Sequence, residues 1–226
     1  KELVSLRHLG IKTPAALLPN FTNVPTKLCK KERKSNVKKV RFLGRLDPIK
    51  GLEDFIIAWS IARPFNWQFI ISGPDFSGYR KHLENLVHTM NCADSIFFEG
   101  PVSKNEKISY FKDTDFLVLP SKSENFGMVV AEALANGVPA LVSTGAPWQI
   151  LDEEKCGFWV ENNVQQWILH LQLLETLDDV KLAELSANAH KTAVDIFCAN
   201  RIIHKFIELY EHIAYDTDKR PNFIYL

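Results

Sequence analysis

Short apolar runs alternate with amphipathic stretches along the chain from Val40 onward. The runs are rich in Val, Ile, Leu and Phe, and each is closed or followed by Gly, Pro, Ser or Glu. Runs that are apolar at successive positions are typical of parallel strands covered on both faces. We therefore expect five strands and a weaker sixth, at Val40–Gly44, Gln68–Gly73, Ser95–Glu99, Phe116–Pro120, Pro139–Ser143 and Phe158–Glu161.

The stretches between these runs have helical spacing, and the pattern after Asn162 is helical only. Strands and helices that alternate in this rhythm form βαβ units. The sequence therefore predicts an α/β fold, a doubly wound Rossmann-like parallel sheet of about six strands followed by C-terminal helices. The expected helices are Leu52–Ala62, Gly78–Met90, Asn105–Lys112, Gly127–Asn136, Val164–Leu177, Lys181–Phe197 and Ala199–Tyr215.

The chain divides into three regions that differ in their pattern of apolar and charged residues. We expect an N-terminal segment at residues 1–38, a domain at 39–215 and a tail at 216–226. Eight basic residues and one acidic residue lie between Lys27 and Arg41. We interpret this stretch as a solvated loop; the alternative is a patch that holds the protein against an anionic membrane.

Composition narrows the class of protein further. The 27 basic and 27 acidic side chains balance, which argues against a general nucleic-acid binder. No apolar run approaches the roughly 20 residues that span a bilayer, and no secretory leader is visible. The chain begins with Lys1 rather than Met, so we expect a fragment of a longer protein.

The positions of the cysteines indicate the cellular compartment, and those of the histidines argue against a metal-binding site. The four cysteines lie far apart, which favours reduced thiols and a cytoplasmic protein; they are Cys29, Cys92, Cys156 and Cys198. The seven histidines are scattered and form no pair at metal-ligand spacing. We expect no metal site.

The loops that follow the strands are the places to look for chemistry, because ligands of doubly wound sheets bind at the carboxyl ends of the strands. Glu124 follows the fourth strand, and Glu132 lies inside an apolar helix that begins near Gly127. A carboxylate in such a helix must be paired or hydrogen-bonded. Sugar hydroxyls could satisfy both carboxylates, with a phosphate at the helix N-terminus. The alternative is that Glu132 pairs with a nearby lysine and Glu124 is solvated.

The loop after the first strand carries two cations, Arg45 and Lys50. A guanidinium binds phosphate oxygens in a bidentate manner, and an ammonium acts as a point charge. The pair therefore suits a diphosphate. The alternative is an ordinary loop with two solvated cations.

The run from Pro120 to Pro139 reads Pro-Ser-x-x-Glu-x-Phe-Gly-x-x-x-x-Glu-Ala-x-Ala-x-Gly-x-Pro. It resembles the signature of family 4 glycosyltransferases (glycosyl transferases group 1). Gly44-Arg45-Leu46 followed by Lys50-Gly51 resembles the first-loop motif of that family, and Leu18-Pro19-Asn20 resembles its hinge-side motif. Together these matches cover roughly residues 15–215.

This resemblance implies one half of a GT-B fold, the C-terminal domain that binds the donor. It implies that Arg45 and Lys50 bind the donor diphosphate, and that Glu124 contacts the transferred sugar and acts with them in catalysis. Glu132 would accept hydrogen bonds from the ribose hydroxyls. The remaining donor-binding residues implied in this way are Gly44, Pro101, Val102, Asn125, Phe126, Gly127, Met128 and Val129.

The function implied is donor binding in a retaining glycosyltransferase that needs no metal or cofactor. The enzyme would transfer a sugar from a nucleotide-diphosphate sugar to a glycan or lipid-linked acceptor, as in bacterial surface polysaccharide synthesis. The acceptor would bind through a missing N-terminal domain, so the isolated fragment would be inactive. Alternatives are a nucleotide-sugar-binding module without transfer activity and a GT-B nucleotide-sugar epimerase. The location implied is the cytoplasm, at the inner face of the membrane.

The sequence departs from the family pattern at two positions. Phe21 stands where the hinge motif has glycine, and Gln149 stands where the family often has glutamate. We assign Gln149 no catalytic role. Trp148 could stack on a sugar or base, but packing inside the domain is the favoured interpretation.

Overall fold

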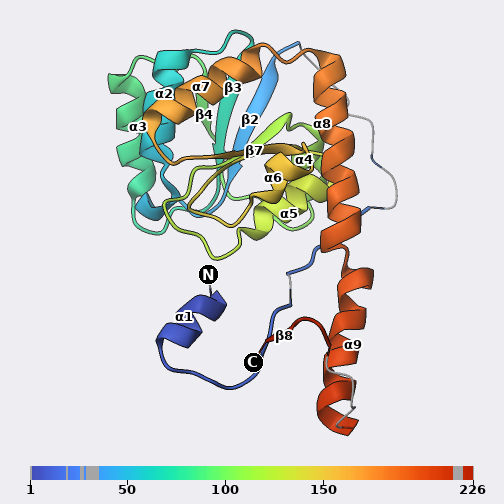
Figure 1. Cartoon of the computed structure of the whole chain (residues 1–226). Coiled ribbons are helices and arrows are strands. Elements are labelled where there is room, and N and C mark those ends of the chain that lie inside the picture. Colours follow the sequence, from blue (N-terminus) through green and yellow to red (C-terminus); the bar gives the residue numbers. More distant parts are fainter. Residues whose placement is uncertain (1, 19, 26–27, 29–35, 216–220, 226) are drawn as a thin grey trace.

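The computed structural model describes residues 2–18, 20–25, 28, 36–215 and 221–225. A six-stranded parallel sheet forms its centre, with the order β4-β3-β2-β5-β6-β7 (Figure 1). The predicted α/β class and the doubly wound Rossmann-like sheet are confirmed. The strands are β2 (Lys38–Leu43), β3 (Trp67–Ser72), β4 (Ile96–Phe98), β5 (Phe116–Leu119), β6 (Ala140–Ser143) and β7 (Gly157–Val160).

The middle strands are apolar because helices cover both of their faces. Every residue of β5 and of β6 is buried. The two strands pair in parallel, with Leu117 opposite Ala140 and Leu119 opposite Val142. Strands buried on both sides cannot show alternation of apolar and polar residues, which explains the continuous runs in the sequence.

Helices α2 (Leu52–Ala62), α3 (Tyr79–Thr89) and α7 (Val164–Glu175) pack together on one face of the sheet (Figure 1). Phe55 of α2 joins this layer to the sheet, since its ring contacts Phe69 of β3 and Trp167 of α7 edge-on. Asn163 begins α7 as its N-cap, where its side chain accepts a hydrogen bond from the Gln166 amide.

The other face carries α4 (Lys107–Lys112), α5 (Met128–Ala135) and α8 (Asp179–Thr192), with α8 continuing into η2 (Ala193–Phe197). His190 of α8 lies 2.9 Å from the Ala135 carbonyl through its Nδ1 atom, so α8 is held against α5. Two single-turn elements were not predicted, because apolar spacing needs more than one turn to show. They are η1 (Pro48–Lys50) after β2 and α6 (Ile150–Glu153) after β6.

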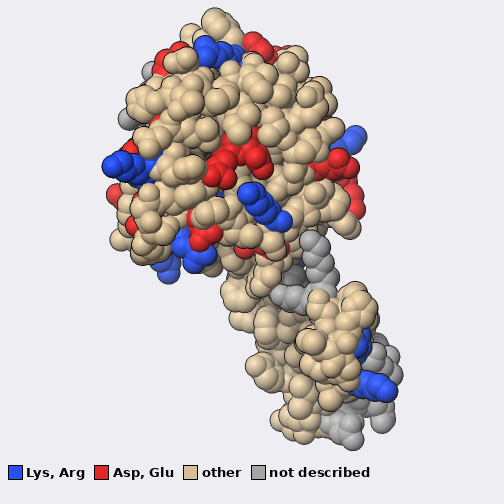
Figure 2. Space-filling view, turned by 90° about the vertical axis from the view of Figure 1, so that its left-hand side faces the viewer, with Lys and Arg blue, Asp and Glu red and all other residues tan. Residues whose placement is uncertain are grey.

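An extension projects from the sheet domain along α9 (Ala199–Tyr215) (Figures 1 and 2). It also contains α1 (Glu2–His8), β1 (Ala15–Ala16) and β8 (Ile224–Tyr225). β1 and β8 pair in an antiparallel manner, although β8 belongs to the segment expected as a tail. No local pattern could predict this pairing. Within the described ranges, no helix is long and apolar enough to cross a lipid bilayer.

Candidate functional site

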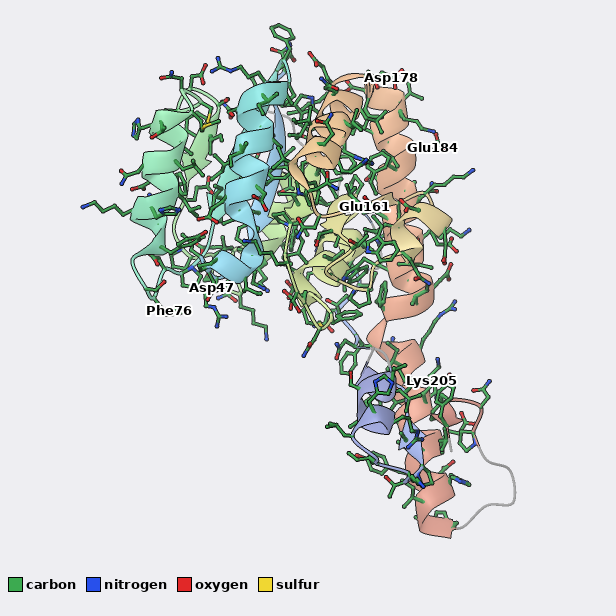
Figure 3. The ribbon with its side chains drawn as sticks, turned by 60° about the vertical axis from the view of Figure 1, so that its left-hand side comes forward. Asp47, Phe76, Glu161, Asp178, Glu184 and Lys205 are labelled. Atoms are coloured by element: carbon green, nitrogen blue, oxygen red, sulfur yellow. The ribbon has the colours of Figure 1, made fainter. Side chains whose placement is uncertain are left out.

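The site lies where the order of the strands reverses. From β2 the chain adds β3 and β4 on one side, then returns to place β5, β6 and β7 on the other. Ligands of doubly wound sheets bind at such a reversal, outside the carboxyl ends of the strands. Asp47, after β2, and Phe76, after β3, mark this edge of the domain in Figure 3.

The loops after β2 and β5 lie against each other at this point. The Lys122 amide donates a hydrogen bond to the Ile49 carbonyl at 2.8 Å. Gly51 permits this approach: its φ is +67°, and a Cβ there would lie 2.1 Å from the Pro120 carbonyl oxygen. A glycine is therefore required between the cationic loop and the loop that carries Glu124.

Lys50 and Glu124 form an ion pair across these two loops. The Lys50 ammonium donates to Oε2 of Glu124, and the two side chains are only 17% and 20% exposed. Partial burial reduces solvent screening of such a pair. The alternative that Glu124 is solvated is therefore wrong. The structure brings together two of the three residues assigned to catalysis by the resemblance.

Arg45 occupies a more open position at the same edge. Its side chain is 56% exposed, and its Nη2 atom lies 3.6 Å from Oδ2 of Asp47. Asp47 itself caps η1, since its Oδ1 accepts a hydrogen bond from the Ile49 amide at 3.0 Å. An exposed pair at this distance stabilises little. The Arg45 guanidinium can therefore turn to a phosphate at low cost.

Glu132 pairs with a lysine that the sequence analysis did not select. Lys107 begins α4, and its Nζ atom lies 2.7 Å from both carboxylate oxygens of Glu132. This is the alternative left open for Glu132. The order of the elements could have predicted this contact. The first turns of α4 and α5 both follow the carboxyl ends of strands, so both lie at the same edge of the sheet.

The N-terminus of α5 lies beside this cluster. Gly127, at φ +81°, precedes Met128 and offers no capping side chain to the first amides of the helix. Such amides attract anions. Phe126 anchors the loop, since its ring lies 5.0 Å from Trp148 and 5.9 Å from Phe197, measured between ring centroids.

Trp148 is a packing residue, as favoured from the sequence. Its side chain is fully buried, and its indole N–H donates to the Phe126 carbonyl. Gln149 follows it as the N-cap of α6 and makes no side-chain cap hydrogen bond. Trp148 therefore supports the loop around Phe126 rather than facing a ligand.

The remaining predicted residues lie along the same edge. Gly44 directly follows β2, and its amide donates to the Ser72 carbonyl at 3.1 Å. Pro101 and Val102 line a cavity of about 330 Å³ between the end of β4 and α4. The edge thus offers cations, carboxylates and open amides, a combination that suits a ligand with phosphate and hydroxyl groups.

Across the described residues, no group of three or more His, Cys, Asp or Glu side chains is placed to hold a metal ion. Cys92 and Cys156 are buried and unbridged. Burial raises the pKa of the Cys92 thiol and raises that of Cys156 to about 11.

Comparison with known proteins gives consistent matches. The model of the family glycosyl transferases group 1 matches residues 25–192. An uncharacterised glycosyltransferase of Methanocaldococcus jannaschii is 34% identical over 125 residues, which make up 54% of this chain and 32% of that protein.

Two solved structures share the fold. Sucrose-phosphate synthase from Thermosynechococcus elongatus superposes with a TM-score of 0.82 at 24% identity, over 96% of this chain and 57% of that one. The C-terminal domain of a glycosyl transferase group 1 family protein from Francisella tularensis gives a TM-score of 0.64 at 24% identity, over 72% of this chain and 87% of that domain. The chain thus spans only part of the length of its longer relatives.

Proposed function

The chain belongs to the family of glycosyl transferases group 1, and on this basis we propose that it binds the nucleotide-diphosphate sugar donor of a retaining glycosyltransferase. The observation that carries the proposal is the Lys50–Glu124 pair at the reversal of strand order. Arg45 and the open amides of α5 flank this pair and supply further groups for an anion.

In the proposed complex, Lys50 and Arg45 bind the diphosphate, and Glu124 exchanges its ammonium partner for sugar hydroxyls. When the bond between the anomeric carbon and the phosphate oxygen breaks, its electron pair goes to the diphosphate. The two cations stabilise this developing charge. The acceptor hydroxyl then bonds to the anomeric carbon on the face that the diphosphate left, and its proton passes to an oxygen of the departing diphosphate.

Glu132 takes the ribose in this proposal. Its carboxylate is held by Lys107 at 2.7 Å, so it is already oriented. Ribose hydroxyls would add to this contact as further donors. The acceptor is a glycan or a lipid-linked glycan, and the proposed setting is surface polysaccharide synthesis at the inner face of a membrane. Lys30, Lys31, Arg33 and Lys34, the centre of the proposed anionic-membrane contact, lie outside the described residues.

Calorimetric titration with uridine, guanosine and adenosine diphosphates tests the proposal. We expect at least one of them to bind with a dissociation constant below about 1 mM, which corresponds to a binding free energy of about −4 kcal/mol. Inorganic pyrophosphate should compete, because the cations bind the diphosphate. Absence of binding for all three nucleotides would refute donor binding.

A second candidate function is nucleotide-sugar binding without transfer. It is favoured by one observation, that the site residues Lys50, Glu124 and Glu132 all contact the donor in the proposed complex. Transfer of sugar requires a site for the acceptor as well as one for the donor. An assay of donor hydrolysis and of sugar transfer to added acceptors separates the two functions.

A further inference from the structure

A cavity of about 330 Å³ lies between the end of β4 and α4, next to the site described above. Pro101 and Val102 form an apolar part of its wall. Glu99, Glu106 and Asp113 also line it, together with Arg41 of β2. Carboxylates therefore dominate the charged lining of this cavity.

Arg41 forms ion pairs with two of these carboxylates. Its side chain is only 6% exposed and donates to Glu99 at 3.0 Å and to Asp113 at 2.8 Å. Its guanidinium lies 4.5 Å from the centre of the Tyr110 ring. The Nε atom of Arg41 is buried and has no hydrogen-bond partner among the described residues. Burying an arginine with an unpaired N–H costs free energy. The two ion pairs of Arg41 offset part of this cost, so Arg41, Glu99 and Asp113 form one linked cluster.

Glu99 is held in a fixed orientation at the cavity. One of its oxygens, Oε2, accepts hydrogen bonds from Arg41 and from the Ser72 hydroxyl at 3.1 Å. The Glu99 side chain is nevertheless 45% exposed. Glu106 lies at the start of α4 and accepts a hydrogen bond from the Ser103 amide at 2.9 Å.

The charge balance of the lining favours a ligand that donates hydrogen bonds. Three carboxylates line the cavity with one guanidinium, and Lys39 adds one more cation by pairing with Asp113 at 2.6 Å. Carboxylates outnumber cations even when Lys39 is counted. Carbonyl oxygens of a ligand would meet repulsion here, whereas N–H groups would form charge-assisted hydrogen bonds.

The start of α4 connects the cavity with the proposed donor site. Glu106 directly precedes Lys107, which pairs with Glu132, the residue proposed to bind ribose. A nucleotide with its diphosphate at Lys50 and its ribose at Glu132 would therefore direct its base toward Glu99. The family resemblance already implies that the loop at Gly100–Val102 meets the base of the donor. We propose that the Glu99 carboxylate at this cavity makes the site select guanine, an inference that rests on the proposed function.

Guanine fits the lining by its hydrogen-bonding edge. It presents two adjacent donors, N1–H and the N2 amine, which together match one carboxylate and leave its single carbonyl oxygen, O6, on the far side of N1. Uracil presents a single N–H between two carbonyl oxygens. Adenine places its amine beside N1, which is an acceptor. The wall formed by Pro101 and Val102 suits the apolar face of a purine.

The test compares the affinities of guanosine, inosine and uridine diphosphates for this chain. Inosine keeps the N1–H of guanine but lacks the amine. A site built to hydrogen-bond a ligand N–H rejects an analogue that lacks it, so we expect guanosine diphosphate to bind about tenfold tighter than inosine diphosphate and tighter still than uridine diphosphate.

Glu99→Gln should weaken guanosine diphosphate about tenfold, the loss expected for one charge-assisted hydrogen bond, and leave uridine diphosphate nearly unchanged. The matched control is Glu184→Gln on α8, which also removes a carboxylate from an ion pair, with Lys181 at 2.7 Å, and lies far from Asp47 and Phe76 in Figure 3. If Glu99→Gln lowers the melting temperature sharply, Glu106→Gln serves as the second variant, because Glu106 is exposed.

Uridine diphosphate binding as tightly as guanosine diphosphate would overturn the guanine inference and leave donor binding intact. A preference for guanine that survives in both Glu99→Gln and Glu106→Gln would overturn the assignment to this cavity. Absence of binding for every nucleotide would refute the proposed function itself, which distinguishes the two failures.

Discussion

The Lys50 ammonium donates a hydrogen bond to the Glu124 carboxylate across the point where the strand order of the sheet reverses. The two residues are 74 positions apart in the chain. The ion pair therefore fixes the position of both side chains. A diphosphate and a sugar would replace this one contact by two, phosphate on Lys50 and hydroxyls on Glu124.

Removing either cation should weaken phosphate binding more than nucleoside binding. Each of Lys50→Ala and Arg45→Ala removes a charge-assisted contact of roughly 1.5–3 kcal/mol, which is about ten- to a hundredfold in affinity for a nucleoside diphosphate. Titration with the diphosphate and with the bare nucleoside measures the difference. Lys81→Ala, on the exposed side of α3, is the control. A large drop in melting temperature with unchanged diphosphate affinity would show that the two cations are structural.

The two glutamates should have different effects on binding. Glu132→Gln is expected to weaken the nucleoside diphosphate and the nucleotide sugar alike, by about ten- to a hundredfold, because it faces the ribose in both ligands. Glu124→Gln is expected to spare the diphosphate and weaken only the sugar conjugate. Affinities of both ligands and the melting temperature are measured for each variant. Equal losses for both ligands in Glu124→Gln would contradict the assignment of the sugar to Glu124.

A methyl group at Gly51 should separate the two loops of the site. Gly51→Ala is strained at φ +67° and would place its Cβ 2.1 Å from the Pro120 carbonyl oxygen. Gly78→Ala is the matched control, because its φ is +75° and its Cβ would contact nothing within 4 Å. Both variants lose roughly 1–2 kcal/mol of unfolding free energy to left-handed backbone strain, and Gly51→Ala loses more. Urea unfolding at equilibrium measures both. Equal losses would mean that the loops move apart without cost.

The buried thiols should react slowly at neutral pH. Burial raises the pKa of Cys92, and it raises that of Cys156 to about 11, so little thiolate exists at pH 7. Labelling by a maleimide should accelerate as the pH rises toward those pKa values. Cys198 is less buried and should label first among these three. Peptide mapping by mass spectrometry identifies the labelled residue. Rapid labelling of Cys156 at pH 7 would show that its surroundings open readily.

Local pattern was sufficient to predict the sheet and most helices. The apolar runs at residues 116–120 and 139–143 became β5 and β6, because strands buried on both faces must be apolar throughout. Leu52–Ala62 is helical over the predicted range, since its apolar residues recur at helical spacing and Gly51 precedes it. The position of Arg45, Lys50 and Glu124 after strands placed them at one edge of a parallel sheet before any contact was known.

Which side chains meet was decided by the tertiary structure. No spacing in the sequence connects Glu132 with Lys107, Arg41 with Glu99, or Ala15–Ala16 with Ile224–Tyr225. Arg41 lies in a strand whose neighbours are apolar, and only packing of α4 over β2 shows that carboxylates surround it. Periodicity encodes how each segment folds and which face it buries. Contacts between distant segments depend on the order of the strands and on how the helices pack, so the sequence by itself determined the elements and the tertiary structure determined the partners.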